Sequence, residues 1–423
     1  MNGAEPNQKD LLRRNFLWTL VGSALYAVSQ WAILVILARL GGPTTVGRFS
    51  LGLSITAPVM LLSNLNLRAI QATDARSDYT FGDYFGLRLV TSVLALALVG
   101  VITTYPRRET ATTLVVLAVG ILKTIESLSD VAYGLLQKHE VMDLVSISMV
   151  LRGLGLAAAV SAGLALTKDL LVGLCFGAAA WLLVFLFFDL RFARRFERLS
   201  PRFRRGQLRR LVRLSLPLGI VMMLISLNAN VAVYFVEHAG GEASVGFFSP
   251  INYLVFAGFL VVEALGRSAS PRLAQHLVAG ERRAFWRLQW RLVAAGVAMG
   301  SLGALGAVTL GKLLLTIVYG ERYAAHHSVL TWLMVASIAS YASGFLGFGF
   351  TAARRLAVQI PTNAVTLGVN VALCAILVPR YGILGAAWAA CGAAGARLVV
   401  DLGLALSAWL VAESEGTNGH AVP

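Results

Sequence analysis

Long apolar runs, separated by short polar connections, occupy almost the whole length of the chain. A helix needs about 20 mostly apolar residues to cross the roughly 30 Å hydrocarbon core of a bilayer. The pattern predicts twelve such helices and therefore an all-α integral membrane protein. They span residues 16–38, 47–70, 85–104, 111–135, 142–166, 170–190, 214–236, 247–268, 290–312, 328–350, 357–378 and 384–411.

The chain also contains an internal repeat. The sequence GGPTTVGRFS at residues 41–50 returns as GGEASVGFFS at residues 240–249, an offset of 199 residues. A second match, LFFDL at 186–190 and LVVDL at 398–402, has an offset of 212 residues. Repeats of this length indicate two equivalent halves.

The repeat divides the predicted helices into two sets of six. Because six is an even number, both sets enter the membrane from the same side. We therefore expect two parallel six-helix bundles, residues 1–190 and 214–423, around a central cavity, with a basic cytoplasmic linker at residues 191–213. Parallel repeats of this kind are typical of transporters, in which the substrate site lies between the halves.

Positive charge is distributed unequally between the connections. If the N-terminus is placed inside, 25 of the 36 lysines and arginines fall on the inner side and 8 on the outer side. This positive-inside pattern predicts a multi-pass membrane protein with both termini cytoplasmic. The net charge of +15 then favours anionic membrane lipids, and not nucleic acid, as the partner of the basic linker.

The composition argues against a soluble protein and against an enzyme. Hydrophobic residues make up 57% of the chain, and the mean hydropathy is +0.73. The cysteines Cys175, Cys374 and Cys391 lie in apolar segments, without the spacing of a disulfide framework or a metal site. Residues 306–312 match only the first part of a phosphate-binding loop, because Leu313 follows where Ser or Thr is required. We expect no catalytic residue, cofactor or metal, which leaves transport as the predicted activity.

Several ionisable residues fall at predicted membrane depth. Such residues are costly in a bilayer and usually face a bundle interior or an aqueous cavity. Three pairs are spaced so that they can neutralise each other on one helix. They are Lys123–Glu126, Glu263–Arg267 and Arg397–Asp401. Asp130 lies on the same helix face as the first pair, and both structural pairing and a functional role remain open for these residues.

Two arginines have no carboxylate at such a spacing on their own helix. Arg152 lies near the middle of its predicted helix, and Arg68 has Asn64 where the repeat has Glu263. An unpaired guanidinium in a cavity is suited to binding two phosphate oxygens at once.

Arg152 has an alternative role, in which it faces the neighbouring helix 111–135. Glu126 or Asp130 would then neutralise it, and its role would be structural.

The first 90 residues resemble a known family. The resemblance lies in Leu12–Leu40, in GGPTTVGRF at 41–49, in NLRAIQATD at 66–74 and in FGDY at 81–84. These segments resemble the Wzx-type oligosaccharide flippases of bacterial polysaccharide biosynthesis. The two predicted bundles resemble the multidrug/oligosaccharidyl-lipid/polysaccharide exporter superfamily over nearly the whole chain.

The resemblance implies a substrate and its partners. The substrate would be an undecaprenyl-pyrophosphate-linked oligosaccharide. It would be moved to the outer leaflet of the bacterial cytoplasmic (inner) membrane by alternating access, for O-antigen, capsule or exopolysaccharide synthesis. A polysaccharide polymerase and assembly proteins would be its protein partners. The implied cationic cavity would be lined by Arg68, Lys123, Arg152 and Arg397. The candidates for ion coupling or for pairing are the carboxylates Glu126, Asp130, Glu263 and Asp401.

Three alternatives remain. A cation-coupled multidrug antiporter of the same superfamily often carries a carboxylate on its first helix, where this chain has only Ser29 and Gln30. A polysaccharide polymerase would be expected to have a large external loop, which the predicted topology lacks. A non-transporting assembly scaffold would not explain the internal repeat or the charges at membrane depth. The flippase is the favoured interpretation.

Overall fold

The structure is a computed structural model that describes residues 8–74, 77–104, 108–353 and 359–418. The described residues are predominantly helical and contain no strand. Four arginines that contribute to the charge asymmetry, Arg76, Arg107, Arg354 and Arg355, lie outside the described residues. The chain divides into two compact units, Met1–Ser226 (unit 1) and Leu227–Pro423 (unit 2), which are described separately.

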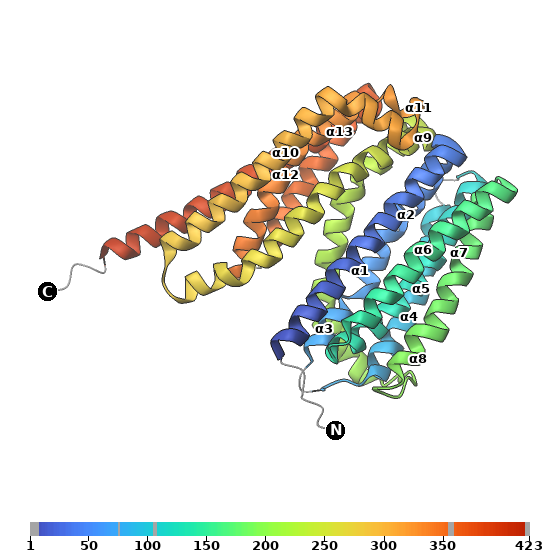
Figure 1. The fold of residues 1–423 in the computed structure, drawn as a ribbon, viewed down its shortest axis with the longest axis horizontal. Coiled ribbons are helices and arrows are strands. Elements are labelled where there is room, and N and C mark those ends of the chain that lie inside the picture. The colour runs from blue at the N-terminus through green and yellow to red at the C-terminus, as the bar shows by residue number, and fades with distance from the viewer. Residues whose placement is uncertain (1–7, 75–76, 105–107, 354–358, 419–423) are drawn as a thin grey trace. The chain divides into compact units, whose positions relative to one another are not determined.

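Unit 1 is a bundle of long helices that lie alongside one another (Figure 1). Its elements are α1 (Gln8–Ile36), the π-helical turn η1 (Leu37–Gly41), α2 (Gly42–Asn64), α3 (Leu67–Thr73), α4 (Phe81–Thr104), α5 (Thr110–Lys138), α6 (Met142–Thr167), α7 (Leu170–Val184), the π-helical turn η2 (Phe185–Asp189), α8 (Leu190–Ala193) and the first part of α9 (Arg205–Val278). Helices α2, α3, α4 and α7 all pack against α5, while α6 packs against α1 and α7. Helix α5 is therefore central to the bundle.

Unit 2 contains the rest of α9 and four further helices. They are α10 (Arg282–Tyr319), α11 (Glu321–Ala324), α12 (His327–Ala352) and α13 (Gln359–Asn418). Helix α12 packs against both α10 and α13. Its buried side chains Tyr341 and Phe345 form a hydrophobic core with Val262 of α9 and Val293 of α10.

Nine helical stretches of the described residues are long and apolar enough to cross a membrane. Three of these stretches are broken at glycines with positive φ angles, Gly42 (78°), Gly241 (70°) and Gly382 (58°). Glycine adopts such angles without the steric cost that a Cβ atom brings. The breaks lie in the connections that the hydropathy pattern predicts at 39–46, 237–246 and 379–383. The predicted all-α, multi-pass membrane fold is confirmed.

The two copies of the repeat share their local structure. In the first copy, the hydroxyl of Thr45 donates a hydrogen bond of 2.8 Å to the carbonyl oxygen of Gly41. In the second copy, the hydroxyl of Ser244 donates one of 2.9 Å to the carbonyl oxygen of Gly240. The second glycine of each copy carries the positive φ angle described above. The similarity at an offset of 199 residues therefore extends to hydrogen bonds and backbone conformation.

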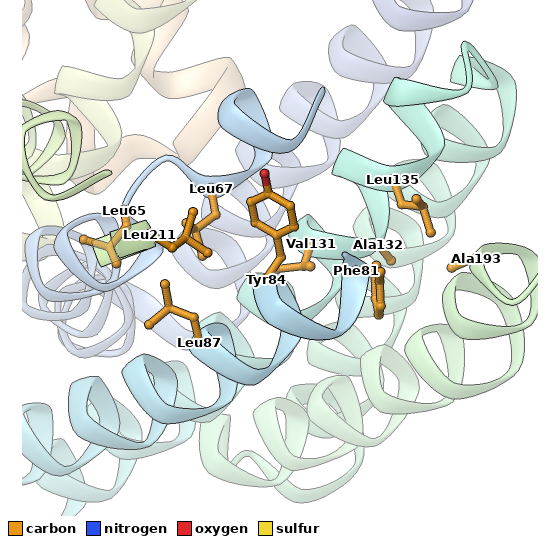
Figure 2. Packing of buried hydrophobic residues seen from close by; sticks show 10 residues of the cluster. All are labelled: Leu65, Leu67, Phe81, Tyr84, Leu87, Val131, Ala132, Leu135, Ala193 and Leu211. Carbon is orange, nitrogen blue, oxygen red and sulfur yellow. The ribbon is translucent and has the colours of Figure 1, made fainter. Parts of the chain in front are cut away.

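A buried hydrophobic cluster holds the ends of several elements of unit 1 together (Figure 2). It draws residues from the α2–α3 turn, α3, α4, α5, α8 and α9. Its members are Leu65, Leu67, Phe81, Tyr84, Leu87, Val131, Ala132, Leu135, Ala193 and Leu211. The cluster fixes α3 against α5. Two of its members, Leu67 and Leu87, directly precede Arg68 and Arg88 in the sequence, which are described below.

The connection between α8 and α9 is docked onto the N-terminal end of α4. The backbone N–H of Arg202 donates to the carbonyl oxygen of Gly82 (2.8 Å), and the N–H of Phe81 donates to Oε2 of Glu197 (2.8 Å). A Cβ atom on Gly86 would lie 2.2 Å from the carbonyl oxygen of Arg202, so this close approach requires glycine. The segment predicted as a linker is therefore attached to unit 1, and its last residues already belong to α9.

Candidate functional site

A pocket of about 520 Å³ lies within unit 1. Residues of α2, α3, α5 and α9, and of the turn between α2 and α3, line it. The lining residues are Ala57, Met60, Leu61, Asn64, Asn66, Arg68, Ala69, Lys123, Glu126, Ser127, Asp130, Gln137 and Met222. Of the four cationic positions that the resemblance implies, Arg68 and Lys123 lie in this pocket.

A sharp break between α2 and α3 positions Arg68. Leu65 and Asn66 both have left-handed φ angles, 51° and 50°. Asparagine is enriched in this conformation, whereas a leucine there is uncommon. Opposite the break, Gly134 of α5 lets α3 approach closely, because a Cβ atom at that position would lie 2.3 Å from Oε1 of Gln71 and 3.3 Å from Cα of Arg68.

The guanidinium of Arg68 has three neighbours. Its Nε donates a hydrogen bond of 3.0 Å to Oε1 of Gln137, and its Nη1 lies 3.6 Å from Oδ1 of Asp130. The guanidinium also lies over the ring of Tyr133, 5.4 Å from the ring centroid, in a cation–π arrangement. About a quarter of the Arg68 side chain (27%) is exposed, so it is accessible from the pocket.

Arg88 of α4 is a member of the site that the sequence analysis missed. Its side chain is 0% exposed, although the sequence pattern assigned it only to the inner-side charges. Its Nη1 donates to Oδ1 of Asn64, and its Nη2 lies 3.4 Å from Oδ2 of Asp130. The hydroxyl of Ser127 also donates to Oδ1 of Asn64. Arg88 lies near the start of the predicted helix 85–104, a position that by itself does not mark an arginine as buried.

The predicted pair within α5 is present. The Nζ of Lys123 donates a hydrogen bond of 2.7 Å to Oε2 of Glu126, three residues further along the helix. The hydroxyl of Tyr26 in α1 donates one of 2.7 Å to Oε1 of the same carboxylate. Glu126 is thus held on both oxygens, and the charge of Lys123 is neutralised within the pocket.

The structure corrects the expectation for Arg152. Its Nη2 donates a hydrogen bond of 2.7 Å to Oδ2 of Asp189, and the two side chains are 2% and 0% exposed. Arg152 is therefore neither unpaired nor among the residues that line the pocket. The alternative, a structural ion pair, is the observed arrangement, but the hydrogen-bonded partner is Asp189 of η2 and not Glu126 or Asp130.

Tyr133 connects this buried pair to the pocket. Its ring lies 5.4 Å from the guanidinium of Arg152 and 5.4 Å from that of Arg68, measured to the ring centroid. Its hydroxyl lies 2.7 Å from the hydroxyl of Ser148, which in turn donates to Oδ1 of Asp189. Because the single hydroxyl proton of Ser148 is donated to Asp189, Tyr133 is the donor in its hydrogen bond with Ser148.

The remaining candidates belong to unit 2. On α13, Nε of Arg397 lies 3.5 Å from Oδ2 of Asp401, and its Nη1 donates to Oδ1 of Asn363 (3.1 Å). On α9, Nε of Arg267 donates to Oε1 of Glu263 at 2.7 Å, and the Arg267 side chain is largely exposed. Both pairs predicted from the i,i+4 spacing are present, and neither contributes to the pocket of unit 1.

The charges in and around the pocket do not cancel. Among the described residues, the ion pairs of Arg68, Arg88 and Lys123 are made with two carboxylates, Glu126 and Asp130, which leaves one positive charge in excess. Such an arrangement in a membrane-spanning unit is suited to an anion. Within the described part of the chain, no group of three His, Cys, Asp or Glu side chains could hold a metal ion.

Comparisons with known proteins bear on the family and the fold. The family described as polysaccharide biosynthesis protein matches residues 12–276. The capsular polysaccharide biosynthesis protein CapF of Staphylococcus aureus is 25% identical over 376 residues, which cover 88% of this chain and 94% of CapF. The resemblance that was drawn from the first 90 residues is confirmed.

The solved structures that share the fold include a flippase and a multidrug transporter. The lipid II flippase MurJ, in an inward closed conformation, has a TM-score of 0.74 at 12% identity, over 92% of this chain and 87% of that chain. A multidrug resistance transporter of the MATE family, which belongs to the MOP superfamily, has a TM-score of 0.72 at 11% identity in its inward-facing conformation, over 96% and 100% of the two chains.

Proposed function

We propose, from the premise that this chain belongs to the polysaccharide biosynthesis protein family, that it moves a lipid-linked oligosaccharide across the cytoplasmic membrane. The substrate is an undecaprenyl-pyrophosphate-linked repeat unit that passes from the inner to the outer leaflet for the synthesis of a surface polysaccharide. Relatives named for capsule biosynthesis and for lipid II flipping support this assignment.

The observation that carries the proposal is the excess positive charge at the pocket of unit 1. Retaining charge at membrane depth is costly, and such residues usually mark the path of a substrate or an ion. A pyrophosphate diester offers oxygen atoms that a guanidinium binds in pairs. Of the two partly exposed cations of the pocket, Arg68 has the weaker ion pair, because it lies 3.6 Å from Asp130, whereas Lys123 lies 2.7 Å from Glu126.

The proposed mechanism is alternating access by twelve membrane-spanning helices in two parallel halves. Helices predicted at residues 1–190 and 214–423 would enclose the substrate's headgroup and sugars, while the lipid tail stays in the bilayer. The basic linker, residues 191–213, lies on the cytoplasmic side against anionic lipids. The protein acts as a transporter without a catalytic residue or cofactor, and a polymerase and assembly proteins take up its product.

The proposal is tested by deletion and complementation in the source bacterium. Deletion is expected to trap lipid-linked repeat units on the inner leaflet and to abolish a surface glycan, and the wild-type gene restores it. Arg68→Ala should fail to restore the glycan at normal protein abundance, whereas Arg209→Ala, which removes an exposed charge outside the pocket, should succeed. An unchanged surface glycan together with increased drug sensitivity would favour the multidrug antiporter instead.

A further inference from the structure

Asp130 is shared by two arginines. Its Oδ1 lies 3.6 Å from Nη1 of Arg68 in α3, and its Oδ2 lies 3.4 Å from Nη2 of Arg88 in α4. Both distances are longer than the 2.7 Å of the tight ion pairs Arg152–Asp189 and Lys123–Glu126. One carboxylate carries a single negative charge and can neutralise only one of its two arginines.

Arg88 depends more strongly on this carboxylate than Arg68 does. Arg88 is fully buried, its Nε has no hydrogen-bond partner within the described residues, and its other contact is the neutral amide of Asn64. Burial makes an uncompensated charge very unfavourable. Arg68 is 27% exposed at the pocket and has Gln137 as a further partner. The charge left over in the pocket is therefore that of Arg68.

The second carboxylate of the pocket cannot take over this role. Glu126 accepts hydrogen bonds of 2.7 Å from both Tyr26 and Lys123, so both of its oxygens are occupied. Asp130 has no such fixed arrangement, and 27% of its side chain is exposed. It can shift toward Arg88 without leaving the pocket.

We propose that Asp130 is a built-in competitor for the anion site at Arg68. Without substrate, the carboxylate partly occupies the side of the guanidinium that faces the pocket. When phosphate oxygens bind Arg68, Asp130 moves its charge to Arg88, and it returns when the phosphate leaves. This exchange keeps the binding of the headgroup reversible, as a transporter requires. The inference rests on the proposed function only for the identity of the anion.

The test uses a double substitution that keeps the net charge unchanged. Arg88→Gln together with Asp130→Asn removes one positive and one negative charge, so a change in anion affinity does not arise from bulk electrostatics. The purified full-length protein in detergent is titrated with inorganic pyrophosphate, and the heat of binding is measured. The double variant should bind roughly two- to fivefold more tightly than wild type, because a partly exposed ion pair no longer has to be broken.

A second pair of substitutions guards against a folding defect. Arg88→Met with Asp130→Asn removes the same charges through an apolar side chain, and melting temperatures show which double variant is folded. Adding Arg68→Ala to the folded one should abolish the binding of pyrophosphate. Equal affinity of wild type and the folded double variant overturns the inference and leaves the proposed function standing. The absence of binding in both proteins also overturns it.

The inference and the proposed function can fail separately. If pyrophosphate binds more tightly to the double variant, and the gene deletion leaves the surface glycan unchanged, Asp130 is the competitor that we propose. The transported substrate is then another anion.

Discussion

Arg152 of α6 and Asp189 of η2 form a 2.7 Å ion pair in the interior of unit 1, where the two side chains are 2% and 0% exposed. The pair is completed by Ser148, which donates to the second oxygen of the carboxylate, and by the indole of Trp181, which donates to the backbone oxygen of Arg152 (2.9 Å). Because this ion pair is short and fully buried, we expect it to stabilise the fold, whereas the longer contact of Arg68 with Asp130 at the pocket can be opened by a ligand.

Removing one partner of the buried pair should destabilise the protein strongly. Arg152→Ala leaves the carboxylate of Asp189 buried without compensation, at a cost of about 3–5 kcal/mol. Arg152→Met with Asp189→Asn should recover most of this loss, because no buried charge remains and the amide still accepts from Ser148. The abundance in membranes and the melting temperature of the purified protein measure both effects. If Arg152→Ala has wild-type abundance and loses only the surface glycan, Arg152 acts on the substrate.

A methyl group at Gly86 should disturb the docking of the linker. The added Cβ atom would lie 2.2 Å from the carbonyl oxygen of Arg202, and the backbone has to shift, which costs about 1–3 kcal/mol. Gly100→Ala is the matched control on the same helix, because nothing lies within 4 Å of its Cβ position. Thermal unfolding should show a lower melting temperature for Gly86→Ala, and an equal or higher melting temperature for Gly100→Ala, because alanine favours a helix more than glycine does. Equal melting temperatures would mean that the contact is not maintained.

Gly241 should be required for its backbone conformation alone. Its φ of 70° and ψ of −171° belong to a region that is nearly exclusive to glycine, although nothing lies within 4 Å of its Cβ position. Gly241→Ala should therefore destabilise unit 2 by about 1–3 kcal/mol. Gly306→Ala, at a helical position with equally open space, should stabilise it by up to about 1 kcal/mol. Comparable effects of the two substitutions on the melting temperature would contradict this explanation.

Gly206 offers a site for testing the topology. A Cβ atom there would meet nothing within 4 Å, so Gly206→Cys should leave the fold unchanged. In a variant without the three native cysteines, this position should resist an impermeant thiol reagent in intact cells and react after the membrane is opened, because the positive-inside pattern places it in the cytoplasm. Labelling in intact cells would reverse the assigned orientation.

The features that the sequence predicted well are local ones. A run of apolar residues specifies a membrane-spanning helix, and glycines such as Gly42 and Gly241 mark the breaks between such helices. The pairs Lys123–Glu126 and Arg397–Asp401 follow from helical spacing alone. Each of these predictions depends only on residues within a few turns of one another.

The features that the sequence did not reveal depend on how helices pack. Arg152 and Asp189 are 37 residues apart, and only the register of α6 against α7 and η2 brings them together. Asp189 is the aspartate of the repeated segment LFFDL, but the sequence gives no indication of the residue that neutralises its charge. Arg88 lies near a helix end, where the hydropathy pattern does not distinguish an arginine at the membrane surface from a fully buried one.

The docking of Arg202 onto α4 also determines where the first half of the molecule can end. The carbonyl oxygen of Gly82 accepts from Arg202 and the N–H of Phe81 donates to Glu197, both of which follow α8, and Leu211 completes the cluster around Tyr84. A polypeptide that ended at residue 190, where the first predicted half ends, would lack these partners. The N-terminal end of α4 and the cluster around Tyr84 would then be exposed to solvent. A half-length ancestor before gene duplication, or a fragment made in the laboratory, would need to extend into α9 to fold as a finished unit.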